Sequence, residues 1–177
     1  MCDISKALTI DGWMNEDELR WLAEEASEHD SIIELGCLLG RSTRALGDHT
    51  KGEVIAIDDW YGPREIFVPD EVRASLYNQF LDNMSDLIIK GKVRPLRVSH
   101  RDEVSLAKVR DADMVFIDGD HNYQAVKEDI LFWQKKVVKG GLLCGHDARD
   151  ISVSQAVIEL LESPGIVPNT DIWVQYV

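Results

Sequence analysis

The sequence of 177 residues predicts an α/β fold in which helices cover both faces of a mostly parallel, doubly wound sheet. Three observations support this prediction. Short apolar runs alternate five times with amphipathic segments, which is the pattern of strands joined by right-handed helical crossovers. Most of these runs are continuously apolar and do not alternate with polar residues, as expected for strands that are buried on both faces. Four of the five expected strands also end in charged residues, at the edge of such a sheet where ligands bind.

The first half of the chain contains the elements that begin this alternation. Asn15 can cap a helix that ends near His29. Pro95 lies within an expected strand and indicates an edge position, because proline cannot donate a hydrogen bond to a neighbouring strand. The remaining expected elements of this half are a strand at 31–35, a helix from Ser42, a strand at 54–58, a long helix through 72–84 and the strand at 93–98.

The second half repeats the alternation. A short helix at 105–109 precedes a strand that ends at Asp118, and a helix at 123–137 follows. The turn Lys139-Gly140-Gly141 leads into a strand at 142–146. A last helix at 152–161 ends at Ser163-Pro164-Gly165, and a strand closes the chain from Ile172.

Composition limits the classes of function. The chain is 45% apolar and 29% charged, as in soluble globular proteins, and we expect one domain over residues 1–177 with a helical lead-in over 1–30. Three widely spaced cysteines and the lack of a long apolar run favour a cytoplasmic protein without a membrane segment. A net charge of −13 disfavours a nucleic-acid partner. The apolar helix faces could pair within one chain or between two chains of a homodimer.

The stretch ELGCLLGRST, from Glu34 to Thr43, combines a strand end, a glycine turn and a helix start. Gly36 and Gly40 would let the backbone approach a ligand closely, and the helix start offers free N–H groups. An ordinary tight turn with a helix cap fits this stretch equally well. The dinucleotide fingerprint G-x-G-x-x-G is absent.

Asp58 ends the second strand, where a carboxylate can accept hydrogen bonds from the hydroxyl groups of a ribose. A solvated residue at the end of a strand is the alternative. The mixed loop from Trp60 to Pro69 and the helix after it, within residues 59–90, either cover a substrate site or act as a spacer.

The segment FIDGDH, from Phe116 to His121, and the segment CGHD, which ends at Asp147, carry the densest charge at strand ends. Neighbouring strands lie about 4.8 Å apart, so Asp118 and Asp147 can meet and hold a divalent cation. His121 can act as a general base near neutral pH. Alternatively, the carboxylates cap helices and His121 lies in a solvated turn.

Taken together, these motifs resemble a known family. IIELGCLLGRST, FIDGDHNY, DILFW and GGLLCGHD occur in that order between Ile32 and Asp147. The chain resembles class I S-adenosylmethionine-dependent methyltransferases, and it is most similar to a small branch related to sugar and catechol-type O-methyltransferases. The resemblance implies a Rossmann-like sheet with the strand order 3-2-1-4-5-7-6, an antiparallel last strand and a sixth strand reduced to about residues 165–167.

The resemblance also implies where S-adenosylmethionine binds. The methionine part would lie near the glycine turn, the ribose at the second strand, the adenine past the third and the sulfonium at the fourth. The residues implied are Glu34, Gly36 and Gly40 for the methionine part, Asp58 for the ribose, Ser99 for the adenine and Asp118 for the sulfonium end.

Related O-methyltransferases bind a divalent metal at the ends of strands four and five. By this resemblance Asp118 and Asp147 would hold Mg²⁺ or Mn²⁺, and His121 matches a proposed base. The chain departs from the pattern at His146, which stands where the sugar enzymes carry an acidic ligand.

The predicted function is methyl transfer to a small-molecule acceptor, with Asp118 and His121 as catalytic residues and a hydroxyl oxygen as the acceptor atom. Nitrogen stays open as the acceptor atom. Three rival readings stay open as well: a nicotinamide-dependent oxidoreductase, a metal-dependent hydrolase that uses Asp118, Asp120 and Asp147, and a binding protein that has kept the fold without activity.

Overall fold

The computed structural model describes residues 2–62, 67–99 and 102–177. Within them, seven strands form one sheet in the order β3-β2-β1-β4-β5-β7-β6. β1 to β5 are parallel, whereas β7 runs antiparallel to β5 and β6. This fold and this strand order are the predicted ones. The strands are β1 Ser31–Leu35, β2 Glu53–Asp58, β3 Val93–Arg97, β4 Ala112–Ile117, β5 Val137–Gly145, β6 Gly165–Ile166 and β7 Trp173–Tyr176.

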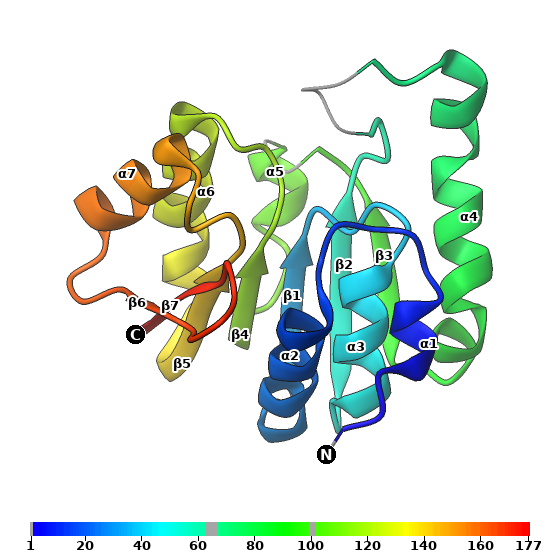
Figure 1. Ribbon diagram of the computed structural model, residues 1–177, viewed down its shortest axis with the longest axis horizontal. Helices are drawn as coiled ribbons and strands as arrows, with labels where there is room; N and C mark the ends of the chain where they lie inside the picture. The colour runs from blue at the N-terminus through cyan, green and yellow to red at the C-terminus, as the bar shows by residue number, and fades with distance from the viewer. Residues whose placement is uncertain (1, 63–66, 100–101) are drawn as a thin grey trace.

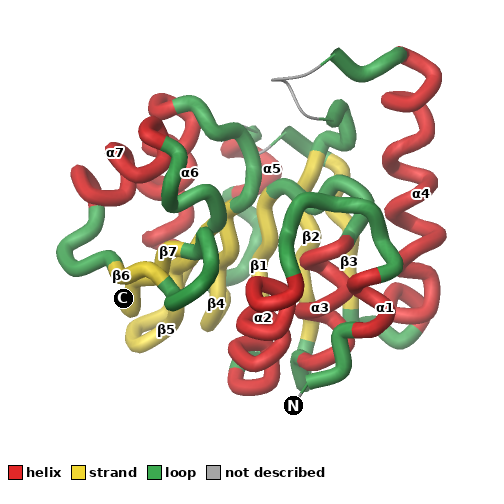
Figure 2. The backbone as a smooth tube through the Cα atoms, viewed as in Figure 1, coloured by secondary structure: helices red, strands yellow, loops and turns green. Residues whose placement is uncertain are grey.

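Helices cover both faces of the sheet (Figures 1 and 2). One face packs against α1 to α4, and the other packs against α5 to α7. The register of β1 shows how the strands serve both layers, since Ile32 joins the first core and Ile33 the second. The helices are α1 Ser5–Leu8, α2 Glu16–Glu28, α3 Arg41–His49, α4 Asp70–Ile89, α5 Glu103–Leu106, α6 Tyr123–Trp133, the 3₁₀ turn Gln134–Lys136 and α7 Ile151–Leu160.

Several local predictions are confirmed. β3, which contains Pro95, lies at an edge of the sheet. Asn15 caps α2, because its side chain accepts a hydrogen bond from the N–H of Glu18.

The boundary between α6 and β5 differs from the prediction. The helix was expected to reach Val137, and a turn was expected at Lys139 to Gly141, but α6 ends at Trp133 and β5 starts at Val137. The β-branched pair Val137 and Val138 favours extended backbone. Gly140 has a φ of +81°, and the register between β4 and β5 shifts between Val137 and Leu142. This irregularity accommodates the glycines within the strand.

The short helix before β4 also differs. It was expected at 105–109, but α5 spans Glu103–Leu106. Asp102 explains the early start, because its side chain accepts hydrogen bonds from the N–H and the hydroxyl of Ser105.

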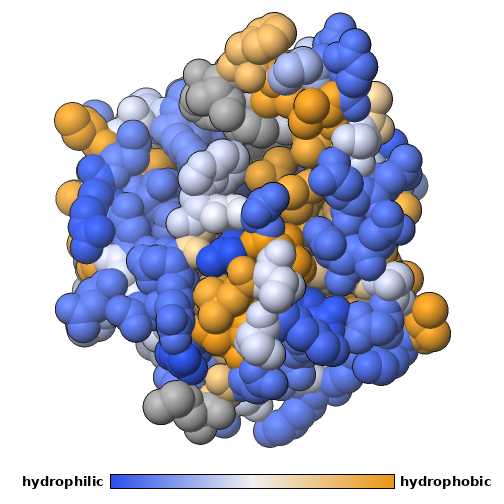
Figure 3. Space-filling model, turned by 45° about the vertical axis from the view of Figure 1, so that its right-hand side comes forward, coloured by the Kyte–Doolittle hydropathy of each residue, from blue (hydrophilic) through white to orange (hydrophobic). Residues whose placement is uncertain are grey.

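The surface carries apolar residues as well as charge. On the face drawn in Figure 3, hydrophobic residues run from the top of the molecule through its centre, between hydrophilic flanks. Within the described part of the chain, no helix has both the length and the apolar character that crossing a membrane requires.

Candidate active site

A cavity opens at the carboxyl edge of the sheet, where β1, β2, β4 and β5 end. Its lining comes from five segments that are distant in the sequence. They are residues 11–14, parts of 36–42 and 57–62, residues 118–121 and residues 146–147. The four strand ends that carry charge in the sequence therefore meet at one cavity, as expected for a parallel sheet.

One side of the cavity, which we call the glycine-turn wall, consists of residues 36–42 together with Asp58. Gly36 has a φ of +82°, and a side chain on it would place Cβ 1.9 Å from the carbonyl oxygen of Asp118. The backbones of β1 and β4 approach this closely because the N–H of Asp118 donates to the carbonyl of Leu35 at 2.8 Å. Only glycine fits at this position.

Asp58 holds the glycine turn in place. Its Oδ2 accepts hydrogen bonds from the N–H groups of Cys37 and Leu38, both at 2.9 Å, and its Oδ1 accepts one from Trp60 at 2.6 Å. Burial raises the pKa of Asp58, and these backbone hydrogen bonds oppose the rise. A carboxylate accepts about four hydrogen bonds, so the three from described residues leave roughly one acceptor position of Asp58 for a ligand hydroxyl.

Glu34 and Gly40 lie behind the glycine-turn wall. Glu34 is fully buried, and it accepts hydrogen bonds from the hydroxyl groups of Ser42 and Thr43 at the start of α3. Burial raises the pKa of Glu34 to about 7. Gly40 caps α3 with a φ of +92°, and a Cβ there would meet the side chain of Met84 at 2.9 Å. Both residues thereby fix the position of Ser42, which lines the cavity.

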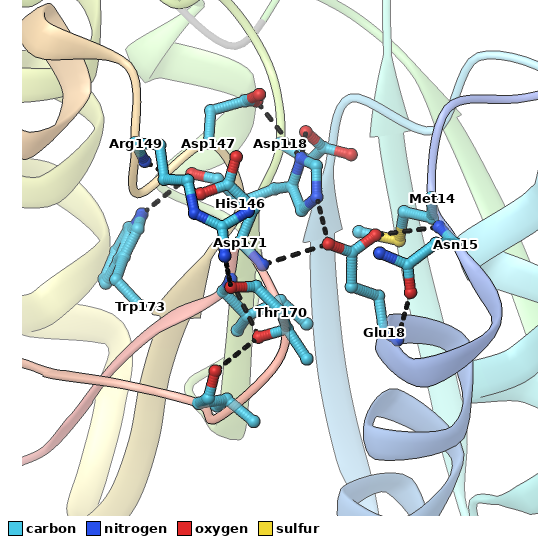
Figure 4. A network of polar contacts seen from close by, with 12 residues as sticks. Met14, Asn15, Glu18, Asp118, His146, Asp147, Arg149, Thr170, Asp171 and Trp173 are labelled. Atoms are coloured by element: carbon cyan, nitrogen blue, oxygen red, sulfur yellow. Dashed lines mark hydrogen bonds and ion pairs between the residues drawn. The ribbon is translucent and has the colours of Figure 1, made fainter.

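A second part of the cavity lining is the carboxylate–histidine cluster, which consists of Asp118, His121, His146 and Asp147. Nε2 of His121 lies 3.0 Å from Oδ2 of Asp147. Nδ1 of His146 lies 3.3 Å from the same oxygen and 3.7 Å from Oδ1 of Asp118 (Figure 4). The structure thus brings together the side chains of Asp118, His121 and Asp147, as the sequence predicts, and adds His146 between the carboxylates.

The charges of the cluster depend on one another. Burial raises the pKa of Asp118 to about 6, and the charge of Asp147 adds to the rise. Burial alone would lower the pKa of His146, but its hydrogen bond with Asp147 and the charge of Asp118 raise it to about 9. The hydrogen bonds from both histidines hold the pKa of Asp147 well below its usual value, against the effect of burial. The neighbouring carboxylates therefore favour the protonated form of His146.

The sequence matches the family model described as a methyltransferase domain over residues 33–148, about two-thirds of the chain. The chain belongs to this methyltransferase family. The matched region includes both walls of the cavity and ends just after Asp147. No curated protein sequence matches the chain.

Solved structures with the same fold come from several organisms. The methyltransferase is similar to a proposed O-methyltransferase from Klebsiella pneumoniae, with a TM-score of 0.68, 15% identity and coverage of 98% of this chain and 87% of that chain. It is similar to TomG from Streptomyces achromogenes, an O-methyltransferase in complex with SAM, with a TM-score of 0.65, 15% identity and coverage of 92% and 79%. It is also similar to the SAH-bound methyltransferase PaMTH1 from Podospora anserina, with a TM-score of 0.64, 13% identity and coverage of 93% and 80%.

The donor atoms of the methyltransferase suit a divalent cation at one point of the cluster. Asp118, His121 and Asp147 each offer one ligand atom, and these atoms all lie within 4.8 Å of one another. Two carboxylate oxygens and an imidazole form a donor set that suits Mn²⁺, and the carboxylates alone suit Mg²⁺. The residues present therefore fit a metal ion.

Two residues that were expected at the site of the methyltransferase, Ser99 and Trp60, are not among the described residues that line the cavity. Ser99 follows β3 by two residues, and the residues that line the cavity do not include it. Trp60, expected in a covering loop, is buried against Tyr77 and Phe80 instead. Asp59 and Gly62 of the same loop do line the cavity, while residues 63–66 lie outside the described part of the chain.

The N-terminal segment was not predicted to take part in the site of the methyltransferase. Residues 11–14 line the cavity, and Trp13 is 71% exposed there. Arg41 holds the segment, because its Nε donates to the carbonyl of Met14 at 2.9 Å and its Nη1 donates to that of Ile10 at 2.6 Å. Glycine at position 12 leaves room for the side chain of Arg41, since a Cβ on Gly12 would lie 2.8 Å from Cδ of Arg41. The only signal in the sequence was a glycine placed shortly before a helix cap.

Proposed function

We propose that this methyltransferase transfers a methyl group from S-adenosylmethionine to a hydroxyl group of a small-molecule acceptor. The observation that carries this proposal is the convergence of two different walls on one cavity. The glycine-turn wall offers backbone groups and one carboxylate, whereas the carboxylate–histidine cluster offers proton-accepting and metal-binding groups. The presence of SAM in TomG and of SAH in PaMTH1 supports the choice of cofactor.

The glycine-turn wall would bind the cofactor. Backbone at Gly36 and the start of α3 would contact the methionine part, with Glu34 and Gly40 fixing the wall from behind. The available acceptor position of Asp58 would hold the ribose, and Ser99 would approach the adenine. When bound, S-adenosylmethionine supplies a methyl group on a positively charged sulfur, which suits the carboxylate of Asp118 nearby. Holding donor and acceptor in line lowers the barrier by several kcal/mol.

The carboxylate–histidine cluster would prepare the acceptor. His121 would take the proton of the hydroxyl, and its contact with Asp147 orients the ring for that step. Asp118 and Asp147 would hold Mg²⁺ or Mn²⁺, which would lower the pKa of the hydroxyl. The loop and helix within residues 59–90 would cover the acceptor, a role that the position of Asp59 and Gly62 at the cavity supports.

The wider setting follows from charge and cysteine chemistry. A net charge of −13 favours a small-molecule acceptor over a nucleic acid. The cysteines at positions 2, 37 and 144 are free thiols, which supports a cytoplasmic protein in a reducing compartment and a single domain that needs no disulfide.

Calorimetric titration tests the proposal most directly. We expect S-adenosylhomocysteine and S-adenosylmethionine to bind the folded protein with one site per chain, and NADH to leave the S-adenosylhomocysteine isotherm unchanged. The same titration after dialysis against EDTA, and then with Mn²⁺ added back, separates the cofactor site from the metal site. A folded protein that binds neither adenosyl compound would refute the proposal.

A further inference from the structure

We propose that Glu18, on the N-terminal helix α2, is a positioning residue of the active site that acts through His146. The inference rests on the proposed function only for the roles of His121 and Asp147. It adds that the N-terminal helix contributes to the catalytic site, because its buried carboxylate fixes the orientation of the His146 ring within the carboxylate–histidine cluster.

The contacts of Glu18 exceed those of a helix cap. Its side chain is 4% exposed. Oε2 accepts a hydrogen bond from the N–H of Asn15 at 2.8 Å, which completes the capping box of α2. Oε1 points away from the helix, accepts a hydrogen bond from the N–H of Asp171 at 3.0 Å and lies 3.3 Å from Nε2 of His146 (Figure 4).

His146 depends on Glu18 for its orientation. Its Nε2 is buried and has an ion-pair contact with Glu18, although no hydrogen bond of good geometry reaches this nitrogen within the described structure. The backbone of His146 is fixed separately, because the indole N–H of Trp173 donates to its carbonyl at 3.1 Å. The ring could still rotate, and a carboxylate on its Nε2 side keeps Nδ1 turned toward Asp147 and Asp118.

A continuous chain of contacts then reaches the proposed base. Glu18 contacts His146, His146 contacts Asp147, and Asp147 contacts His121, at 3.3, 3.3 and 3.0 Å respectively. If the ring of His146 turned away, Asp147 would lose one of its two histidine partners, and His121 would be held less firmly. Misplacement of a reacting group by about 1 Å can lower a rate by up to about 100-fold.

Two substitutions separate this role from helix capping. Glu18→Gln keeps an acceptor for the capping box, in which glutamine also serves, but removes the negative charge that faces His146. Asn15→Ala does the reverse, because it removes the side chain of the cap and leaves the carboxylate in place. A role in helix capping alone predicts the larger effect for Asn15→Ala, whereas a role of the Glu18 carboxylate toward His146 and the N–H of Asp171 predicts it for Glu18→Gln.

The first experiment needs no turnover. In protein labelled with ¹⁵N-histidine, the ring-nitrogen signals of His146 are assigned from their loss in His146→Gln. We expect Glu18→Gln to shift these signals and Asn15→Ala to leave them in place. Unchanged signals in Glu18→Gln, or equal shifts in both variants, would overturn the inference. This result is independent of the proposed function.

The second experiment measures methylation of 3,4-dihydroxybenzoate as a probe acceptor. We expect Glu18→Gln to lower kcat by about 10- to 100-fold with an unchanged KM for S-adenosylmethionine, and Asn15→Ala to keep the wild-type kcat. Equal kcat values for the two variants would overturn the inference. If the wild type does not methylate the probe, the choice of acceptor fails, and the histidine signals still decide the role of Glu18.

Discussion

The two walls of the cavity are built in opposite ways. The glycine-turn wall comes mainly from the consecutive residues 36–42, whose backbone groups face the cavity and are held by the carboxylates of Asp58 and Glu34. The carboxylate–histidine cluster comes from the ends of β4 and β5, and Glu18 of α2 supports it from behind. One wall is therefore specified by local conformation, and the other is specified by side-chain contacts between distant segments.

This difference predicts how each wall responds to change. The glycine-turn wall should fail through sterics, because its shape depends on backbone torsions that only glycine adopts easily. Substitutions in the carboxylate–histidine cluster should leave the protein folded and lower its catalytic rate. The reason is that the ionisation states of these side chains depend on their pairing and burial. The variants below test this contrast, beginning with the largest effect.

The largest effect is expected for Gly36→Ala in the glycine-turn wall. The new Cβ would overlap the carbonyl of Asp118 at 1.9 Å, and the backbone would have to hold a φ of +82° with a side chain. We expect a loss of stability of more than about 4 kcal/mol, which is at the upper end for single substitutions. Urea unfolding followed by circular dichroism measures the loss, and calorimetry should show no binding of S-adenosylhomocysteine.

Gly91→Ala is the matched control for this prediction. Gly91 also has a positive φ, at +70°, but a Cβ there meets nothing within 4 Å. Only the torsional cost of about 1 to 2 kcal/mol should appear. If both variants lost the same stability, close approach of β1 and β4 would not be the reason for glycine at position 36.

The second effect belongs to the carboxylate–histidine cluster. In His121→Gln the proposed base is lost, while a polar side chain of similar length remains beside Asp147. We expect kcat to fall by about 10²- to 10³-fold. The affinity for S-adenosylhomocysteine and the urea midpoint should stay at the wild-type values.

His49→Gln serves as the control for the loss of a histidine. His49 lies at the end of α3, and its Nδ1 is 2.8 Å from the carbonyl of Ala45, outside the cavity. Its kcat should equal that of the wild type. A similar fall in both variants, or a fall in His121→Gln that comes with loss of the fold, would contradict a base at position 121.

The third effect is a pH dependence of stability that comes from Glu34, behind the glycine-turn wall. Burial raises the pKa of Glu34 to about 7 in the folded state, above the ordinary value of 4.5. The folded protein therefore holds a proton that the unfolded chain has lost between these values, and the contribution to stability falls as pH rises through about 7. The wild type should lose on the order of 3 kcal/mol of unfolding free energy between pH 4.5 and 8 from this group.

Glu34→Gln should remove most of that loss, because an amide does not titrate. Urea midpoints of both proteins at pH 5 and pH 8 provide the measurement. The exposed Glu162 supplies the control, since Glu162→Gln should keep the wild-type dependence. Parallel pH curves for the wild type and Glu34→Gln would show that Glu34 is ionised in the folded protein at all these values.

Local pattern was enough to predict the sheet and the glycine-turn wall. The strands at Ser31 and Val54 are largely apolar runs, and the glycines after the first run mark the turn, so local sequence sets both. The α6–β5 boundary could not be predicted in this way. Gly140 and Gly141 read as a turn, but β5 continues through them, because it pairs with β4 on either side of them and both glycines are hydrogen-bonded to Val177.

The residues of the site also fall into those that local sequence could predict and those that only long-range contacts place. Asp118 and Asp147 could be placed together because both follow strands that are neighbours in a parallel sheet. Glu18 could not be placed there, because as a sequence feature it is the third residue of a capping box, and its contact with Asp171 spans 153 positions. The burial of Trp60 depends likewise on where α4 packs. Such contacts depend on long-range packing, which the periodicity of apolar residues in the sequence does not reveal.

The smallest effect concerns Trp13, which belongs to neither wall. This residue lines the mouth of the cavity, remains 71% exposed and is held by the contacts of Arg41 with the backbone on both sides of it. An indole in this position offers a flat apolar surface to the acceptor and little to the core. Trp13→Ala should raise the KM of the acceptor about 10-fold, or ~1.4 kcal/mol, with no change in the KM of S-adenosylmethionine.

Ile89 provides the control that shows whether the effect of Trp13 on KM depends on its position at the cavity or only on its being an exposed apolar residue. Ile89 is 86% exposed at the end of α4 and does not line the cavity, so Ile89→Ala should leave every kinetic constant at its wild-type value. Both variants should keep the urea midpoint, since neither side chain is buried. If Trp13→Ala raised the KM of S-adenosylmethionine instead of that of the acceptor, residues 11–14 would belong to the cofactor side of the cavity, and the N-terminal segment would extend the glycine-turn wall.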